Sequence, residues 1–158
     1  MTAPVTVWIA ALGKSEPSYG GWSYVRRGVD GTLAGAAGGE RRVTGALMAL
    51  EGLAEALASL GDLGPTTPTL IHLADPDLAA ELKAKAGDGL AASLEPQAWA
   101  RVTALLAARP GAALSPLAVS TPAAGFALAW AQFGLDTAKT RGKFKAALPR
   151  PNLLKFPS

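Results

Sequence analysis

The side chains best suited to chemistry stand together after an apolar run, in the stretch TLIHLADPDL. Asp75 and Asp77 could share one divalent cation, because carboxylate oxygens are the ligands that Mg²⁺ prefers in proteins. The same spacing suits the start of a helix, where Asp77 would cap the first turn beside Pro76. We favour helix capping for this pair and retain Asp75 as a candidate metal ligand.

Other reactive residues are sparse. The chain has no cysteine and one histidine, His72, which excludes disulfides and a structural zinc site. No serine and aspartate accompany His72 in the order that a catalytic triad needs, so we expect a packed side chain and not a base. The glycine-rich stretch Gly35–Glu40 lacks the following lysine and hydroxyl residue of a phosphate-binding loop, and it predicts a flexible turn.

Basic residues gather at the carboxyl end of the chain. The net charge is only +3, yet no acidic residue follows Asp136. The segment 140–158 is therefore a basic tail, and its prolines argue against one continuous helix. Such a tail either contacts a polyanion or is a solvated, partly disordered terminus, and the sequence leaves both open. Candidate nucleic-acid contacts are Arg26, Arg27, Arg41, Arg42, Lys139, Arg141, Lys143 and Lys145.

The amino-terminal third of the chain predicts three strands. The apolar run Val5–Leu12 and the aromatic segment Gly21–Arg27 both have the composition of strands. Turn residues within 28–31 then lead into a third, weaker strand. Strands joined in this way form an antiparallel meander, which needs a partner to cover one of its faces.

Helices and two further strands follow the meander. Apolar residues at spacings of three and four predict an amphipathic helix within Arg41–Leu60. A buried strand over 69–75 and an edge strand over 113–120 come next in the chain. Further helices are predicted over 77–86, 95–108 and 122–139. This order predicts an α/β fold with a five-stranded mixed sheet, in which a three-stranded antiparallel meander adjoins two parallel strands and helices cover both faces.

Length and hydropathy set the outer limits. A chain of 158 residues is typical of one domain with a substantial buried core. The apolar run at 5–12 is too short to span a membrane, and no basic residue precedes it as in a secretory leader. We therefore expect a cytoplasmic protein that does not contact a membrane.

Four local sequences carry a resemblance to a known family: SYGGWSYV, GALMALEGLAEAL, LIHLADPDL and PQAWARVTALL. In this order they are similar to the glycine-rich entry to the second strand, the first helix, the end of the fourth strand and the tryptophan-bearing helix of the type 1 ribonuclease H family. Members of that family are small nucleases that act on RNA–DNA hybrids. The resemblance implies that residues 1–139 are one ribonuclease H-like domain.

The resemblance also implies a two-metal site, which this sequence does not complete. The family holds two Mg²⁺ ions with four carboxylates, because adjacent cations repel one another. The first two acids correspond here to Ala10, or its neighbour Ala11, and to Ala46. The third corresponds to Asp75, and the last helix offers no acid before its far end. Glu51 does not replace the missing acid, since five residues along a helix rotate its side chain by roughly 140° from Ala46.

With one carboxylate of the family's four, we expect a catalytically inactive ribonuclease H-like domain without a cofactor. It would bind RNA–DNA hybrid, RNA or DNA weakly, or it would contact a protein partner or form a homo-oligomer. The alternative hypothesis is an active, Mg²⁺- or Mn²⁺-dependent ribonuclease for RNA–DNA hybrids that uses an unconventional set of carboxylates.

Overall fold

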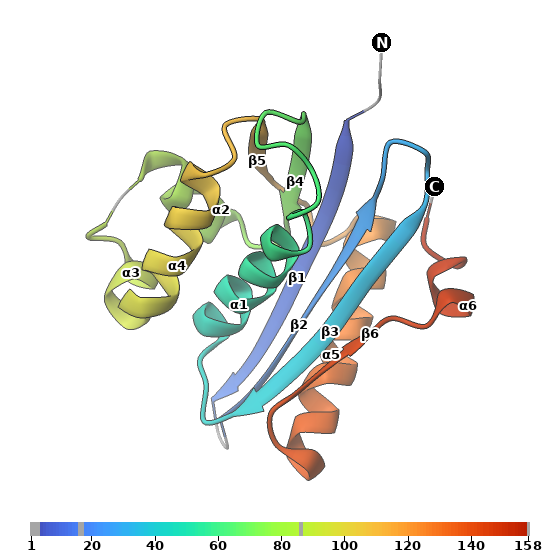
Figure 1. Ribbon diagram of the computed structural model, residues 1–158. Helices are drawn as coiled ribbons and strands as arrows, with labels where there is room; N and C mark the ends of the chain where they lie inside the picture. The colour runs from blue at the N-terminus through green and yellow to red at the C-terminus, as the bar shows by residue number, and fades with distance from the viewer. Residues whose placement is uncertain (1–3, 16–17, 86, 158) are drawn as a thin grey trace.

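The computed structural model describes residues 4–15, 18–85 and 87–157, and within these ranges a six-stranded mixed sheet forms its centre (Figure 1). The strand order is β5-β4-β1-β2-β3-β6. The predicted antiparallel meander is confirmed and consists of β1 (Val5–Ser15), β2 (Ser18–Arg27) and β3 (Leu33–Arg41). The two predicted parallel strands are also confirmed as β4 (Thr69–Leu73) and β5 (Ala112–Pro116).

The additional strand corrects the predicted five-stranded sheet. β6 (Phe144–Ala147) comes from the basic tail and pairs antiparallel with β3 over Ala36–Gly39. Side chains of β6 contact both layers of helices. The Phe144 ring packs edge-on against Phe133, which lies in the helix over 122–141, and the Lys145 ammonium lies 3.0 Å from the Glu55 carboxylate on the other face. The last helix, α6 (Arg150–Leu153), follows.

Helices cover both faces of the sheet, as predicted (Figure 1). α1 (Gly45–Ala58) packs on β1 and β2 from one face, and α5 (Pro122–Arg141) packs on β1, β2 and β3 from the other. No helix of the described residues combines the length and apolar composition that a membrane span requires. The remaining helices are α2 (Pro76–Ala84), α3 (Leu90–Leu94) and α4 (Pro96–Ala107).

The short helix α3 does not appear among the predicted elements. Its first turn is held by a contact from α2, because the Glu81 carboxylate accepts hydrogen bonds from the N–H groups of Ala91 and Ala92, both at 3.1 Å. A local pattern does not reveal this contact between neighbouring helices. Ala86, the last residue of the helix predicted over 77–86, lies outside the described residues.

The stretch Gly35–Glu40 belongs to β3 and is not the predicted flexible turn. Its glycines are needed because α5 lies directly against the strands. A Cβ atom on Gly39 would overlap the carbonyl oxygen of Gly134 in α5, and one on Gly21 would overlap that of Ala131. The absence of side chains at these positions therefore permits backbone contact between helix and sheet.

Among the described residues, apolar side chains form a main core on each face of the sheet and a third, small cluster of Trp22, Ala36, Val43 and Met48 beside α1. The larger main core lies under α1 and includes Val7, Ile9 and Leu53, each at most 1% exposed. The second main core lies on the α5 side and draws buried side chains from the end of the chain, namely Leu148, Leu153 and Phe156. Residues 144–157 are thus a folded part of the sheet and its second core, and Ser158 lies outside the described residues.

The contact between α5 and the sheet gives a stability prediction. We expect Gly134→Ala to lower the free energy of unfolding by about 1–3 kcal/mol, because the new methyl group would overlap the backbone of Gly38. The matched control is Gly125→Ala in the same helix, where a Cβ meets nothing within 4 Å. This change should raise stability by about 0.5–1 kcal/mol through helix propensity.

Urea denaturation followed by circular dichroism measures both changes. Equal effects of the two substitutions would contradict direct backbone contact at Gly134.

Candidate functional site

Asp75 follows β4 and caps helix α2. Its Oδ1 atom accepts a hydrogen bond from the Leu78 N–H at 3.0 Å. Pro76 then begins the helix, where its missing N–H costs nothing. Helix capping is confirmed, but the predicted capping residue was wrong by two positions: Asp77 lies exposed in the first turn, where its charge suits the helix dipole.

Asp75 and Ala46 line the same hollow, of about 390 Å³, between α1, α2 and α3. These two of the three positions that the resemblance implies thus lie beside one hollow. Glu81 also lines this hollow, but its two carboxylate oxygens already accept the N–H groups of Ala91 and Ala92. At Ala46 itself a methyl group stands where the resemblance would require a carboxylate.

Ala10 lies on the face of the sheet that α5 covers. It pairs with Ser23 across the β1–β2 ladder, and directly opposed residues point to the same face. The Ser23 hydroxyl donates to the Ala127 carbonyl of α5 at 2.5 Å, so this face is the α5 side. Ala10 is fully buried there, whereas Ala11 packs against the core under α1. Ala10 thus lies in the packed interior between the sheet and α5, away from Ala46 and Asp75.

The donor set does not fit the Mg²⁺ or Mn²⁺ ions that the resemblance implies. Across residues 4–15, 18–85 and 87–157, no three carboxylate, histidine or cysteine side chains stand close enough to hold a metal ion. The start of α5, where the resemblance would require a fourth acid, has Thr121 as its cap instead, with the hydroxyl accepting from the Ala124 N–H at 3.3 Å.

Three glutamates gather around a different hollow, of about 360 Å³, beside Trp22. Burial raises the pKa of Glu51, and the nearby Arg101 guanidinium opposes that rise. Glu51 and Ala46 line different hollows, which agrees with the rotation expected along α1. Each glutamate has a cationic partner: Lys143 and Glu40 lie 3.6 Å apart, Arg101 and Glu51 3.7 Å, and Lys145 and Glu55 3.0 Å.

Two of the predicted nucleic-acid contacts, Arg26 and Arg27, are the last residues of β2 and have partners within the fold. Arg26 donates a hydrogen bond to the Ser59 carbonyl and lies 3.8 Å from the Asp62 carboxylate. The Arg27 guanidinium lies 5.1 Å from the centre of the Trp8 ring. Arg26 therefore contacts the segment that follows α1 on one face of the sheet, and Arg27 contacts the Trp8 ring on the other face.

Three other predicted contacts do come together. Arg41, Arg42 and Lys139 line a hollow of about 430 Å³ with Ser18 and Tyr19. Arg41 donates from Nε to the Ala138 carbonyl at 2.9 Å and from Nη2 to that of Lys139 at 2.8 Å. These bonds satisfy carbonyls at the end of α5 and bring the helix end to the β2–β3 hairpin. We call these five lining residues the basic hollow.

Ser18 and Tyr19 are the two residues of the basic hollow that were not predicted from the sequence, and Tyr19 is the aromatic one. The Lys139 ammonium lies 5.9 Å from the centre of its ring. In the β2–β3 ladder, Tyr19 is directly opposite Arg41. Knowledge of which residues are paired in this hairpin would have identified Tyr19, because residues directly opposite each other point to the same face of the sheet. Arg141 is exposed in the last turn of α5.

His72 is a packed residue, as expected. Its Nδ1 atom lies 3.0 Å from the Ser115 hydroxyl on the neighbouring strand β5. Its ring stacks near Trp8, with 6.1 Å between the ring centres. Burial lowers the pKa of His72, so its imidazole favours the neutral form.

The capping role of Asp75 gives a second prediction. We expect Asp75→Ala to lower the free energy of unfolding by about 1 kcal/mol, because the Leu78 N–H loses its acceptor. Asp75→Asn should leave stability nearly unchanged, since asparagine caps helices about as well as aspartate. Thermal unfolding of both variants tests this expectation, and a loss of the same size in Asp75→Asn would argue that the charge itself matters.

No family model matches this sequence, and no curated protein matches it either. Solved structures do match. Ribonuclease H1 from the halophilic archaeon Halobacterium salinarum is 19% identical with a TM-score of 0.68, over 86% of this chain and 100% of that chain. The N-terminal ribonuclease H domain of a Mycobacterium tuberculosis protein, fused to maltose binding protein, is 16% identical with a TM-score of 0.73, over 87% and 97%.

A third similar structure is LC11 ribonuclease H1 in complex with an RNA/DNA hybrid. It is 13% identical with a TM-score of 0.71, and the match covers 86% of this chain and 99% of that chain. At these identities the similarity shows the fold alone. The strand order, the helices on both faces and these matches together show that the chain has the ribonuclease H-like fold.

Proposed function

We propose that this chain is a nucleic-acid-binding domain that does not cleave its ligand by a two-metal route. The observation that carries the proposal is the basic hollow, where Arg41, Arg42 and Lys139 surround Tyr19. Cations around one hollow suit the neutralisation of neighbouring phosphates. An aromatic ring among them suits stacking with an unpaired base.

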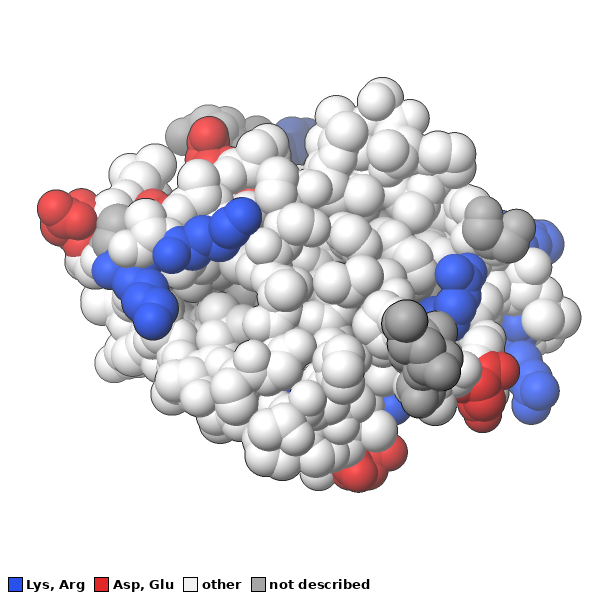
Figure 2. All heavy atoms as spheres, turned by 90° about the horizontal axis from the view of Figure 1, so that it is seen from above, with Lys and Arg blue, Asp and Glu red and all other residues white. Residues whose placement is uncertain are grey.

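The distribution of charge supports this placement. The hollow beside Ala46 is lined by Asp75, Asp77 and Glu81, whose carboxylates would repel a phosphate. Lys143 and Lys145 are paired with glutamates, and Lys139 lies 3.7 Å from the Asp136 carboxylate one turn earlier in α5. The basic hollow nevertheless groups three cations with no acid among its lining residues. Figure 2 views the molecule from above, and that face is largely uncharged with scattered basic and acidic groups. The basic hollow is therefore the surface best suited to a phosphate backbone.

Two structural neighbours are consistent with this class of ligand. LC11 ribonuclease H1 was solved with an RNA/DNA hybrid, and the foamy viral protease-reverse transcriptase was solved with double-stranded DNA. For this chain we propose weak binding of hybrid, RNA or DNA through phosphate contacts. The hypothesis of an active ribonuclease is less well supported, because every acid that lines the two carboxylate-lined hollows, apart from the exposed Asp77, is engaged by backbone N–H groups or cations.

The first test is binding of a fluorescein-labelled RNA–DNA hybrid of about 12 base pairs, measured by anisotropy in EDTA. We expect a dissociation constant of roughly 10⁻⁴–10⁻⁶ M near physiological salt and a steep loss of affinity as salt rises. The double variant Arg42→Gln/Lys139→Gln should weaken binding at least tenfold at low salt and reduce the slope of log K against log salt by about 2. Arg41 is left intact because it holds the end of α5.

The matched control is Lys83→Gln, an exposed lysine on α2 outside the basic hollow. Its affinity and salt slope should equal those of the parent protein. A double variant that also keeps the parental slope would refute the assignment of the basic hollow, and a salt-independent affinity would refute phosphate binding altogether.

The second test concerns cleavage. We expect no cut products when the hybrid is incubated with a high protein concentration in Mg²⁺ or Mn²⁺, because no complete set of metal ligands is present among the described residues. Denaturing gel electrophoresis reads the products, with a known ribonuclease H1 as positive control. Cleavage by the parent protein that Asp75→Asn abolishes would establish the enzyme hypothesis instead.

A further inference from the structure

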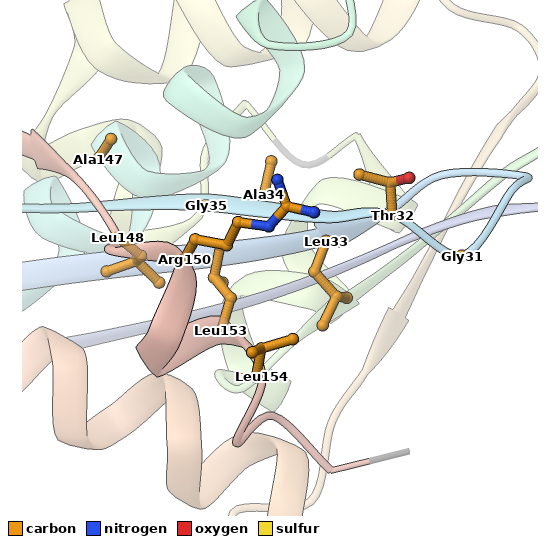
Figure 3. Close-up of a pocket in the computed structure, with 10 residues that line it drawn as sticks. All are labelled: Gly31, Thr32, Leu33, Ala34, Gly35, Ala147, Leu148, Arg150, Leu153 and Leu154. Atoms are coloured by element: carbon orange, nitrogen blue, oxygen red, sulfur yellow. The ribbon is translucent and has the colours of Figure 1, made fainter.

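A separate hollow, of about 390 Å³, lies between the start of β3 and the chain that follows β6 (Figure 3). One wall is the β2–β3 turn with the first residues of β3, and the other is the end of β6 with α6. The second wall lies beyond residue 139, outside the segment that the sequence resemblance covers. The hollow shares no residue with the basic hollow.

The outer edge of β3 is open at this hollow. β6 pairs with β3 from Ala36 onward, and one further bond, from the Leu148 N–H to the Gly35 carbonyl, measures 2.9 Å. In an antiparallel strand, alternate residues direct both backbone groups to the same edge. Leu33, two residues before Gly35, therefore directs its N–H and carbonyl outward, where the chain has already turned away into α6. An extended segment laid here would continue the line of β6.

Leucines form the floor and the rim of the hollow. Leu148 and Leu153 are only 6% and 5% exposed and belong to the second core, which Leu33 joins from β3. Leu154 stands at the rim and is 78% exposed. An apolar side chain placed in the hollow would thus be surrounded by leucine and would remove exposed apolar surface from water.

Arg150 supplies the charge. Its side chain extends from α6 across the hollow toward β3, with the guanidinium beside Ala34 (Figure 3). Within the described part of the chain, no side-chain hydrogen bond or ion pair engages this guanidinium, and no acidic residue lines the hollow. By contrast, Arg41 and Arg109 donate to backbone carbonyls. Arg150 is therefore available to a carboxylate, which its paired N–H groups would bind in bidentate fashion.

We propose that this hollow docks an extended peptide whose carboxylate lies next to an apolar side chain, as at a carboxyl-terminal leucine. The open edge at Leu33 would pair with the peptide backbone, the leucines would surround the apolar side chain, and Arg150 would bind the carboxylate. A phosphate backbone is the poorer occupant, because this leucine-lined hollow offers one guanidinium where the basic hollow offers three cations. The proposed partner is thus a protein, and the site is independent of nucleic-acid binding.

The probe is a fluorescein-labelled hexapeptide of alternating threonine and valine that ends in leucine with a free carboxylate. Its twin carries a terminal carboxamide. We expect the carboxylate peptide to bind at least about tenfold more tightly than the twin, since charge-assisted hydrogen bonds are the stronger kind. Arg150→Gln should remove this difference by weakening the carboxylate peptide alone, as measured by anisotropy on the full chain.

Lys155→Gln is the matched control, because it removes a neighbouring exposed charge outside the hollow. It should preserve the preference for the carboxylate peptide. In a titration followed by amide NMR, the N–H signals of Leu33 and Gly35 should shift, which tests the strand pairing without any substitution.

Several results would overturn the docking proposal: equal affinity for the two peptides, an unchanged preference in Arg150→Gln, or shifts confined to residues away from β3 and α6. A loss of hybrid affinity in Arg150→Gln without peptide binding would make the hollow part of the nucleic-acid interface instead. Because peptide and hybrid are measured separately, failure of one proposal leaves the other to its own test.

Discussion

Direct backbone contact between α5 and the strands β2 and β3 is the constraint on which the rest of this structure depends. Glycines at 21, 39 and 134 remove the side chains that would otherwise separate the helix from the sheet. The close approach lets Arg41, on the last residue of β3, reach the carbonyls at the end of α5. Lys139 is thereby held near the Tyr19 ring. The basic hollow is thus a consequence of how closely this helix approaches the sheet.

The sequence predicted those elements whose formation depends on local pattern. The strand-like composition of the meander with its turn residues, and the periodic apolar spacing of α1, are such local patterns, and both elements were found. β6 was missed because four residues that include two alanines and a lysine have little preference for strand. Its position is set by pairing with β3 and by the contact of Lys145 with Glu55, and neither can be inferred from neighbouring residues. The glycines of β3 were assigned to a turn for the same reason. They are needed because α5, about a hundred residues away in the chain, lies against the strand and leaves no room for side chains.

The candidate sites show a similar division. The sequence placed Asp75 after a strand and Ala46 in the first helix, and the structure brings both to one hollow. It also identified eight basic residues as candidate contacts, but charge alone does not reveal which of them have partners inside the fold. Arg26 and Arg27 contact a carbonyl, an acid and an aromatic ring away from the basic hollow. Arg41, Arg42 and Lys139 line the basic hollow, where Arg41 also donates to carbonyls of α5 and Lys139 pairs with Asp136. To tell which basic residues lie together, one must know which residues of β2 and β3 are opposite each other and at which residue α5 ends.

The pairing of β3 with β6 joins residues more than a hundred positions apart in the chain, as in Ala36 and Ala147. During synthesis, β3 leaves the ribosome several seconds before β6, at roughly 5–20 residues per second. Throughout that interval its edge, rich in glycine and alanine, has no partner strand, and such an edge is a template for association with other chains. The edge of β3 over Ala36–Gly39 is therefore covered only after β6 has been translated, and β6 then becomes the edge strand of the sheet.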